Sequence, residues 1–310
     1  MKEKILVIAG PTASGKTALG VEMAQRLDGE IISADSMQIY KGMDIATAKP
    51  IKEEMRNIPH HLISFVDRNE SFSVADYVIH AAAEAEKIIS CGKMPIVVGG
   101  TGLYISSFVD NIRFPDIKSD EAIRKRLTDE AREYGNSVLL ERLKSCDPEI
   151  AAELHENNLS RVIRALEVYE ITGKKLSEFK KESRMTESPY DFIMTALTYK
   201  DRQKLYDRIN MRVDIMIENG LIEESRQIYN ESNNIKTAHQ AIGYKELIPY
   251  FKNLTSLEEC VEKIKQETRR YAKRQLTWLR KDNRISWIEA DETADINFFI
   301  KKCEKIIAKH

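Results

Sequence analysis

The sequence predicts an α/β fold in which a core with a parallel sheet is interrupted by an inserted helical domain. Short apolar runs alternate with helical stretches over residues 4–98. Residues 116–188 are then charged and helical with almost no strand signal, and a β-like run returns at 192–199. Strands that alternate with helices of this length are typical of a parallel sheet with crossover helices. We therefore predict a core of residues 1–115 plus 189–310 and an insertion domain at 116–188.

The first half of the core begins with Lys4–Ala9 (KILVIA), a continuous apolar run typical of a central strand covered on both faces. Helical spacing follows over 15–27, and Ile31–Ala34 forms a second strand. The alanine-rich stretch 73–90 starts with a serine that can cap a helix. Pro95–Val98 is a further buried strand, which two glycines end.

The part after the insertion is mostly helical. The run 192–199 (FIMTALTY) is expected to return to the sheet, and helices are expected at 202–219 and 255–281. A short strand near 285–288 and a final amphipathic helix follow. The C-terminal part of the core is therefore predicted to be helical.

The composition excludes several classes of protein. The 310 residues are 42% hydrophobic and 31% charged, as in a globular protein with a substantial core. No apolar run is long enough to cross a membrane, and the run at 5–9 is too short for a signal peptide. We therefore expect a cytoplasmic protein without membrane association. The net charge of −1 means that a nucleic-acid partner would need a local basic surface.

The cysteines and histidines do not predict a metal centre. The four cysteines lie far apart, which favours reduced and mostly buried thiols over a zinc site or a disulfide framework: Cys91, Cys146, Cys260 and Cys303. His60 and His61 are adjacent, and neighbouring residues of a strand point to opposite faces. We expect both histidines to be structural.

A phosphate-binding motif lies between the first strand and the first helix, so the core is predicted to be P-loop NTPase-like. The residues fit G-x-x-x-x-G-K-[ST]: Gly10, Pro11, Thr12, Ala13, Ser14, Gly15, Lys16 and Thr17. Backbone N–H groups and the helix N-terminus bind phosphate, Lys16 adds a full charge, and the Thr17 hydroxyl can bind Mg²⁺. The motif predicts an anchored di- or triphosphate with Mg²⁺ as cofactor.

Phosphoryl transfer does not follow from this motif. Kinases and hydrolases with a P-loop usually place an aspartate at the end of a hydrophobic strand, where it organises Mg²⁺. Here the strand at 95–98 ends in the segment Gly99–Gly102 instead. A diphosphate leaving group is therefore as consistent with the sequence as a transferred phosphate.

Asp35 is the one carboxylate at the predicted strand ends, where ligands of such sheets lie. A carboxylate in this place can act as a general base. It can equally cap a turn or hold a magnesium-bound water, and the residues alone leave these alternatives open.

Six segments in order resemble the tRNA dimethylallyltransferase (isopentenyltransferase) family over nearly all of residues 4–289: GPTASGKT, DSMQIYKGMDIATAKP, PHHLISF, VGGTGLY, RALEVYEITGK and AKRQLTWLRK. The resemblance implies a P-loop core with an inserted helical domain. It implies transfer of the dimethylallyl group of dimethylallyl diphosphate to the N6 amine of the adenosine 3′ of the anticodon, at tRNA position 37. The P-loop would then bind the diphosphate rather than ATP. The absence of zinc-finger spacing after residue 289 fits the bacterial form, and we expect a monomer.

The resemblance also implies roles for single residues. Asp35 would deprotonate the attacking amine, Thr101 would lie against that amine, and Lys16 and Arg212 would act on the diphosphate. Arg208 and Arg212 would both bind the diphosphate. They are four residues apart on a predicted helix and so point the same way, although without the resemblance they would indicate an exposed helix face.

Contacts with the tRNA anticodon stem-loop are implied for a wider set: Asp35, Ser36, Met37, Gln38, Thr101, Arg124, Ser160, Arg161, Val162, Ile163, Arg164, Gln240, Ala241, Ile242, Gly243, Tyr244 and Lys245. Many relatives have N-D-x-R-R where this chain has residues 157–161, so Asn158 and Ser160 replace charged residues. The basic stretch 263–284, with Tyr271 and Trp278, can follow a phosphate backbone, although part of it is expected to be an ordinary exposed helix. The target adenine would have to be extruded from its stack.

Three other functions compete with this one. The first is a small-molecule kinase that uses ATP, and the second is an isopentenyltransferase that acts on free adenine nucleotides. The third is an RNA-binding module in which the nucleotide site only regulates docking. A helical insertion and a basic C-terminal helix favour tRNA over a free nucleotide as the acceptor.

Overall fold

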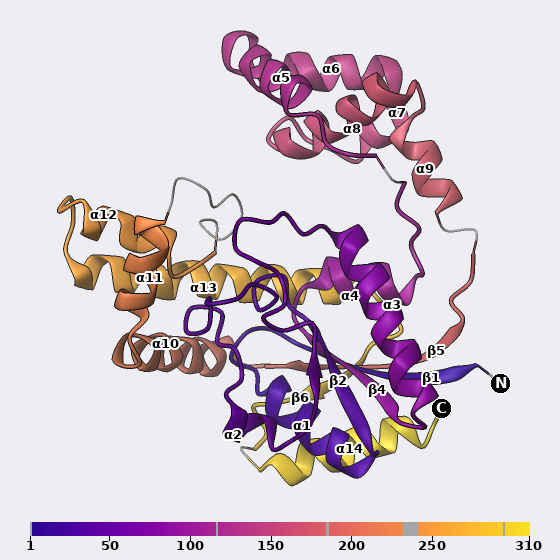
Figure 1. Ribbon diagram of the computed structural model, residues 1–310, viewed down its shortest axis with the longest axis vertical. Coiled ribbons are helices and arrows are strands. Elements are labelled where there is room, and N and C mark those ends of the chain that lie inside the picture. Colours follow the sequence, from indigo (N-terminus) through magenta and orange to yellow (C-terminus); the bar gives the residue numbers. More distant parts are fainter. Residues whose placement is uncertain (1, 116, 184–185, 232–240, 294) are drawn as a thin grey trace. The chain divides into compact units, whose positions relative to one another are not determined.

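The computed structural model describes residues 2–115, 117–183, 186–231, 241–293 and 295–310 (Figure 1). The chain forms two compact units, one of Met1–Val109 with Ser188–His310 and one of Asp110–Glu187. The second unit includes the chain on both sides of its helices. Asn111 donates a hydrogen bond to the carbonyl of Glu187 (3.2 Å), and Arg164 donates one to the carbonyl of Ile117 (3.0 Å). The unit therefore starts before residue 116, where the sequence placed its start.

The first unit contains a six-stranded sheet in the order β3-β2-β4-β1-β5-β6. Every described pairing is parallel, which confirms the predicted sheet. The strands are β1 (Glu3–Ala9), β2 (Gly29–Ala34), β3 (His60–His61), β4 (Met94–Gly99), β5 (Tyr190–Thr198) and β6 (Ser286–Glu289). Only the two-residue β3 was not predicted, because it is too short to show an apolar alternation.

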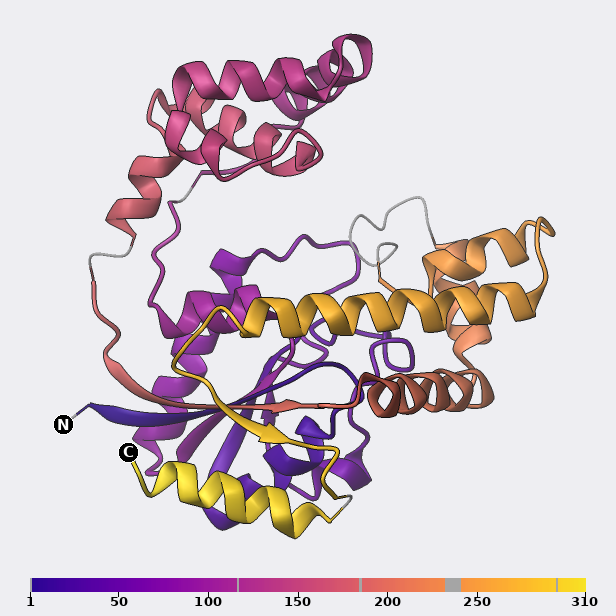
Figure 2. The ribbon, with the colours of Figure 1, turned by 180° about the vertical axis from the view of Figure 1, so that it is seen from behind.

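Helices cover both faces of this sheet, which explains why β1 is apolar at successive positions. Leu6 and Ile8 of β1 pack against α1 (Lys16–Arg26) and α14 (Ile296–Ile307). Ile5 and Val7 point to the other face and pack against α3 (Val74–Ser90) and α4 (Gly102–Val109). Both views show the sheet between these two pairs of helices (Figures 1 and 2).

A third hydrophobic core belongs to the helical C-terminal part of this unit. It lies among α10 (Arg202–Glu218), α11 (Leu221–Asn230), η3 (Lys245–Leu247), α12 (Ile248–Phe251) and α13 (Leu257–Leu279). The loop after β2 contributes Ile39, Tyr40 and Met43 to this core. The short α2 (Lys52–Met55) follows that loop. The loop is therefore packed against helices that lie far away in the sequence (Figure 2).

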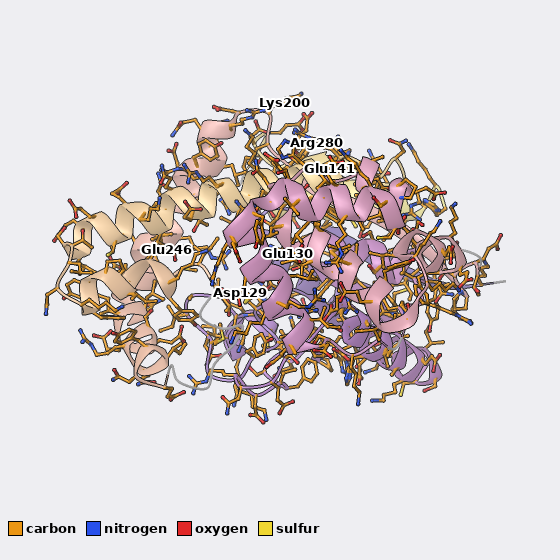
Figure 3. All side chains as sticks on the ribbon, turned by 90° about the horizontal axis from the view of Figure 1, so that it is seen from above. Asp129, Glu130, Glu141, Lys200, Glu246 and Arg280 are labelled. Carbon is orange, nitrogen blue, oxygen red and sulfur yellow. The ribbon has the colours of Figure 1, made fainter. Side chains whose placement is uncertain are left out.

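The second unit consists of helices α5 (Glu121–Tyr134), α6 (Asn136–Cys146), α7 (Pro148–Ala152), α8 (Leu159–Thr172) and α9 (Leu176–Glu182) in its described part. They enclose a separate core of leucine, isoleucine, valine and alanine side chains. The surface of the unit carries both signs of charge. Asp129 and Glu130 on α5 and Glu141 on α6 project from it (Figure 3). A core of its own is what a domain needs to fold as a separate body.

The thiols differ in part from the prediction. All four cysteines are free, as expected, but only Cys260 and Cys303 are buried, whereas Cys146 is partly exposed and Cys91 is exposed. Cys91 is the C-cap of α3, where the chain leaves the helix, and its side chain is exposed. In the described part of the chain, no helix combines the length and the apolarity needed to span a bilayer.

Candidate functional site

The loops that follow β1, β2 and β4 start at one edge of the sheet. Ala34 and Ala9 are both paired in register with Gly99, so the three strands end side by side. Since parallel strands place their carboxyl ends at the same edge, the phosphate-binding loop, the Asp35 loop and the Thr101 loop converge there. This convergence was expected from the sequence.

The phosphate-binding loop turns into α1 at Gly15, whose φ of 92° is unfavourable for any residue with a β-carbon. The ammonium of Lys16 lies back over the loop, 3.3 Å from the carbonyl oxygen of Pro11. Burial, together with the nearby charge of Arg212, lowers the pKa of Lys16 to about 8, although Asp35 opposes the shift. The site therefore has positive charge that an anionic ligand would stabilise.

A cavity of about 250 Å³ opens beside this loop. One wall is polar and contains Thr12, Lys16, Thr17, Asp35 and Arg212. Apolar side chains also line the cavity. Most belong to the third core, and Ile209 and Ala48 lie outside it: Ala46, Ala48, Ile209, Val213, Met216, Leu221, Ala241, Ile242 and Ile264. A cavity with a cationic end and an apolar end can bind an amphiphilic anion.

The two arginines of α10 have separate contacts. Arg212 lines the cavity, and its guanidinium donates to the carbonyl of Ala48 (3.3 Å). Arg208 donates instead to the carbonyl of Ala13 (2.9 Å) and supports the phosphate-binding loop. Although the two residues share a helix face, the structure places Arg212, and not Arg208, among the lining residues.

Asp35 fills one of the roles that the sequence left open, that of a turn cap. Its Oδ1 accepts hydrogen bonds from the backbone N–H groups of Met37 (2.9 Å) and Gln38 (3.3 Å), so the carboxylate caps the turn after β2. Of the residues that the structure describes, none donates to Oδ2. Because Asp35 also lines the cavity, this second oxygen is available for a ligand.

Thr101 lies behind Ser36. Its hydroxyl accepts a hydrogen bond from the Ser36 N–H (3.1 Å) and donates a weak one to the Ser36 hydroxyl (3.5 Å). The hydroxyl of Tyr271 also interacts with Thr101, and burial, followed by the charge of Asp35, raises the pKa of Tyr271 well above its usual value. Asp35, Ser36 and Tyr271 line the cavity, whereas Thr101 is not among its lining residues and is hydrogen-bonded to Ser36 and Tyr271.

The predicted RNA contacts of the first unit lie mostly around this cavity. Ser36, Met37 and Gln38 line it from one loop, and Ala241, Ile242, Gly243 and Lys245 line it from another. The Gln38 amide donates to the carbonyls of Thr47 (3.1 Å) and Ala48 (3.2 Å). The Tyr244 side chain is buried, and Gln240 lies outside the described residues.

The remaining predicted RNA contacts belong to the second unit. The side chains of Val162 and Ile163 are buried in its core. Exposed or partly exposed on α8 are Ser160, Arg161 and Arg164. Arg124 makes a bidentate ion pair with the fully buried Glu167 (2.8 and 3.0 Å), to which Arg164 also donates (2.6 Å). Burial by itself raises the pKa of Glu167, but the hydrogen bonds from these arginines outweigh it and lower the pKa.

The basic helix α13 faces several environments. Ion pairs link Lys265 to Asp214 (2.7 Å) and Arg270 to Glu267 (2.6 Å). Arg274 instead lines the cavity, and the side chain of Trp278 packs over Gly102, where a β-carbon would lie only 2.2 Å from the indole. Part of the helix is therefore structural, as expected.

Gln275 is a polar residue of the site that the sequence reasoning did not single out. Gln275 is 5% exposed, accepts a hydrogen bond from the Thr12 N–H (2.9 Å) and donates one to the carbonyl of Gly100 (3.0 Å). A β-carbon at residue 100 would lie 2.1 Å from the Gln275 amide, so glycine is required there. No local pattern signals this contact, because it joins residues that the fold alone brings together.

The histidines take structural places. His60 lies within hydrogen-bond distance of the Ile58 carbonyl (2.8 Å), and His61 lies between Glu30 (2.7 Å) and Glu84 (3.1 Å). In the described ranges, no group of three or more histidine, cysteine, aspartate or glutamate side chains could hold a metal ion. The hard oxygen ligands that suit Mg²⁺ are instead found in the cavity, where Thr17 and Asp35 both lie.

Known proteins resemble this chain in sequence and in structure. A family model described as IPP transferase matches residues 38–282. The chain is 52% identical over 294 residues to the tRNA dimethylallyltransferase of Caldanaerobacter subterraneus subsp. tengcongensis, and the match covers 94% of this chain and 93% of that protein. A full-length tRNA isopentenylpyrophosphate transferase structure from Bacillus halodurans is 43% identical, with both chains covered completely and a TM-score of 0.71. A eukaryotic dimethylallyltransferase acting on tRNA is 35% identical, with coverage of 93% of this chain and 74% of that chain and a TM-score of 0.80.

Proposed function

The chain belongs to the IPP transferase family and is a prenyltransferase, and we propose that it transfers the dimethylallyl group of dimethylallyl diphosphate to tRNA. The acceptor is the N6 amine of the adenosine 3′ of the anticodon, position 37, and diphosphate is released. One observation carries the proposal. One cavity is lined by residues of the phosphate-binding loop, by Arg212, by Asp35 and by a set of apolar side chains.

The cationic end of the cavity supports diphosphate as the leaving group. The bond from carbon to the diphosphate oxygen breaks most easily when fixed donors meet the charge that develops on that oxygen. The amides of the phosphate-binding loop, Lys16 and Arg212 are such donors. Arg208 is proposed to act on the diphosphate indirectly, because it donates a hydrogen bond to the Ala13 carbonyl of the phosphate-binding loop. Thr17 would hold Mg²⁺, which would supply further charge neutralisation.

Asp35 is proposed as the general base. The lone pair of the adenine amine is delocalised into the ring, so the amine attacks carbon only if its proton leaves as the N–C bond forms. Oδ1 of Asp35 is held by two backbone N–H groups, and the residue lines the cavity, so Oδ2 is proposed to accept the proton. A carboxylate in this role contributes on the order of 10²–10⁴ in rate. Ser36 and Thr101 are proposed to contact the same amine. The Thr101 hydroxyl, which accepts a hydrogen bond from the Ser36 N–H, lies close to Ser36.

Two surfaces are proposed to bind the anticodon stem-loop. Around the cavity they are the segments 35–38 and 241–245, with Gln240 adjoining the second, and Arg274 of α13. In the helical unit they are Arg124, Arg161 and Arg164, together with Ser160. Arginines anchored by a buried carboxylate keep their remaining N–H groups directed outward, which suits contacts with phosphate. The helical unit, predicted at 116–188, would then be an RNA-binding domain.

We propose that the enzyme acts as a monomer. Both proposed substrates are polyanions of the cytoplasm, and we place the enzyme there. No membrane partner is proposed.

The test is incubation of the protein with isotope-labelled dimethylallyl diphosphate and one of three acceptors: bulk tRNA, AMP or ATP. Label is expected in tRNA alone, at the adenosine 3′ of the anticodon. Label in AMP or ATP would indicate an enzyme that acts on free nucleotides. Sustained ATP hydrolysis by the pure protein would contradict the proposal, because no acid at the end of β4 can organise Mg²⁺ for phosphoryl transfer.

A further inference from the structure

The loop over residues 43–49 forms part of the cavity wall but has no regular secondary structure of its own. Ala46, Thr47 and Ala48 line the cavity. The carbonyls of Thr47 and Ala48 accept hydrogen bonds from Gln38, and the Ala48 carbonyl also accepts one from Arg212. The carbonyl side of the loop therefore orients two side chains at the cationic end of the site.

The N–H side of the same loop is bound by one carboxylate, that of Glu224 on α11. Its Oε2 accepts from the backbone N–H groups of Asp44 (2.8 Å) and Ile45 (2.9 Å). Its Oε1 accepts from Ala46 N–H (3.0 Å), with a longer contact to Ile45 N–H (3.1 Å). Consecutive N–H groups around one anion form a nest that a neutral side chain cannot replace, because an amide NH₂ would face an N–H donor.

Glu224 also binds the second RNA-proposed loop. Its Oε1 accepts a hydrogen bond from the Tyr244 hydroxyl (2.7 Å). Burial, followed by the charge of Glu224, raises the pKa of Tyr244 far above its usual value, so the hydroxyl stays a donor. The charge of Glu224 is thus shared between the loop at 43–49 and the loop at 241–245.

The two loops approach each other closely at this point. Gly243 has a φ of 106°, and a β-carbon there would lie 2.9 Å from Cβ of Ala46. The Gly243 N–H donates to Glu246 (2.9 Å), labelled in Figure 3, and its carbonyl accepts a weak bond from Ser225 (3.4 Å). Because such close packing leaves little slack, a shift of one loop moves the other.

We propose that Glu224 is a positioning residue for prenyl transfer, which sets the cavity wall and, through the loop at 43–49, the place of Arg212. Glu224 itself does not line the cavity, so it acts on the diphosphate only through the Ala48 carbonyl and the Arg212 guanidinium. The inference rests on the proposed function for its reaction but on the hydrogen bonds of Glu224 for its geometry.

The test compares Glu224→Gln with Glu223→Gln, an exposed neighbour on the same helix turn. In Glu224→Gln we expect the affinity for inorganic diphosphate to fall on the order of tenfold and kcat to fall by a similar factor. We expect amide hydrogen exchange at residues 44–46 to accelerate, while exchange in β1 and β4 stays as in the unmodified protein. Glu223→Gln should match the unmodified protein in all three measurements.

Unchanged diphosphate affinity together with unchanged exchange at 44–46 would overturn the inference. If Glu224→Gln does not fold, Tyr244→Phe removes a single donor and serves in its place. We then expect faster exchange at 44–46 and a smaller loss of diphosphate affinity, and no change in either quantity would again overturn it. Neither readout needs tRNA, so a failure of the proposed acceptor would be seen separately, as absence of label transfer by the unmodified enzyme.

Discussion

At the scale of single residues, the two carboxylate oxygens of Asp35 have different roles. Asp35 uses Oδ1 to cap a turn and keeps Oδ2 for the cavity. Lys16 also lies in the cavity lining. Its burial there lowers its pKa and so disfavours the charged form that would bind an anion. Both residues can be tested by changes that leave shape and packing nearly intact.

Asp35→Asn keeps the turn cap, because the amide oxygen can accept the same N–H groups, but it removes the proton acceptor. We expect kcat to fall on the order of 10²-fold or more, about 3 kcal/mol of transition-state stabilisation. The tRNA Kd should change far less. Rescue of activity by higher Mg²⁺ concentration would assign Asp35 to the metal instead, and a weaker Kd with an unchanged single-turnover rate would assign it to RNA positioning.

The lowered pKa of Lys16 predicts that diphosphate binding depends on pH. Its pKa in the free protein is about 8, so the ammonium is charged below that pH and becomes neutral above it. A bound diphosphate favours the charged form. We therefore expect the diphosphate Kd to be level below pH 8 and to weaken as the pH rises further. Calorimetric titration across pH 7 to 10 measures this, and Lys16→Arg, which stays charged, should show a level Kd throughout.

At the scale of elements, α13 connects parts of the site that lie on separate strands. Through Gln275 it binds both the phosphate-binding loop at Thr12 and the loop after β4 at Gly100. Through Trp278 it covers Gly102 at the start of α4. One helix therefore sets the distance between the diphosphate donors and the group around Thr101.

Gln275→Met keeps the approximate volume but leaves the Thr12 N–H and the Gly100 carbonyl without their partner. Each unpaired buried group costs about 1–3 kcal/mol, so we expect a lower free energy of unfolding by denaturant and a weaker diphosphate Kd. Gln266→Met is the matched control, because Gln266 is on the same helix and its side chain accepts a hydrogen bond from Lys263. Equal stability and equal affinity in the two variants would show that the Gln275 contacts are dispensable.

At the scale of the whole molecule, the cavity and the inserted helices belong to separate units of the fold. The cavity is built entirely from the first unit in the described chain, and the second unit has its own hydrophobic core. An insertion with an independent core can be gained or removed without exposing the core of its host.

Replacement of residues 110–187 by a short flexible linker should leave a protein that binds dimethylallyl diphosphate with its original Kd. The tRNA Kd should weaken strongly, and the dependence of binding on salt should become shallower because phosphate contacts are lost. Circular dichroism and diphosphate titration verify that the remaining unit is folded. Unchanged tRNA binding in the folded deletion would show that the second unit does not clamp RNA.

The sequence by itself determined the parallel strands other than β3, the phosphate-binding loop and the family resemblance. These features are local. Apolar runs such as Lys4–Ala9 and the glycines around Lys16 determine their own backbone, because periodicity and φ preference act over a few residues. The family comparison confirms the resemblance.

Only the tertiary structure decided which side chains share the cavity. Gln275 meets Thr12 across 263 positions of sequence, and Glu224 meets Ala46 across 178. The same helix spacing that pairs Arg208 with Arg212 could not show that one supports the loop while the other lines the cavity. Such contacts form because buried polar groups must find partners wherever the packed core places them, and no local pattern encodes that partner.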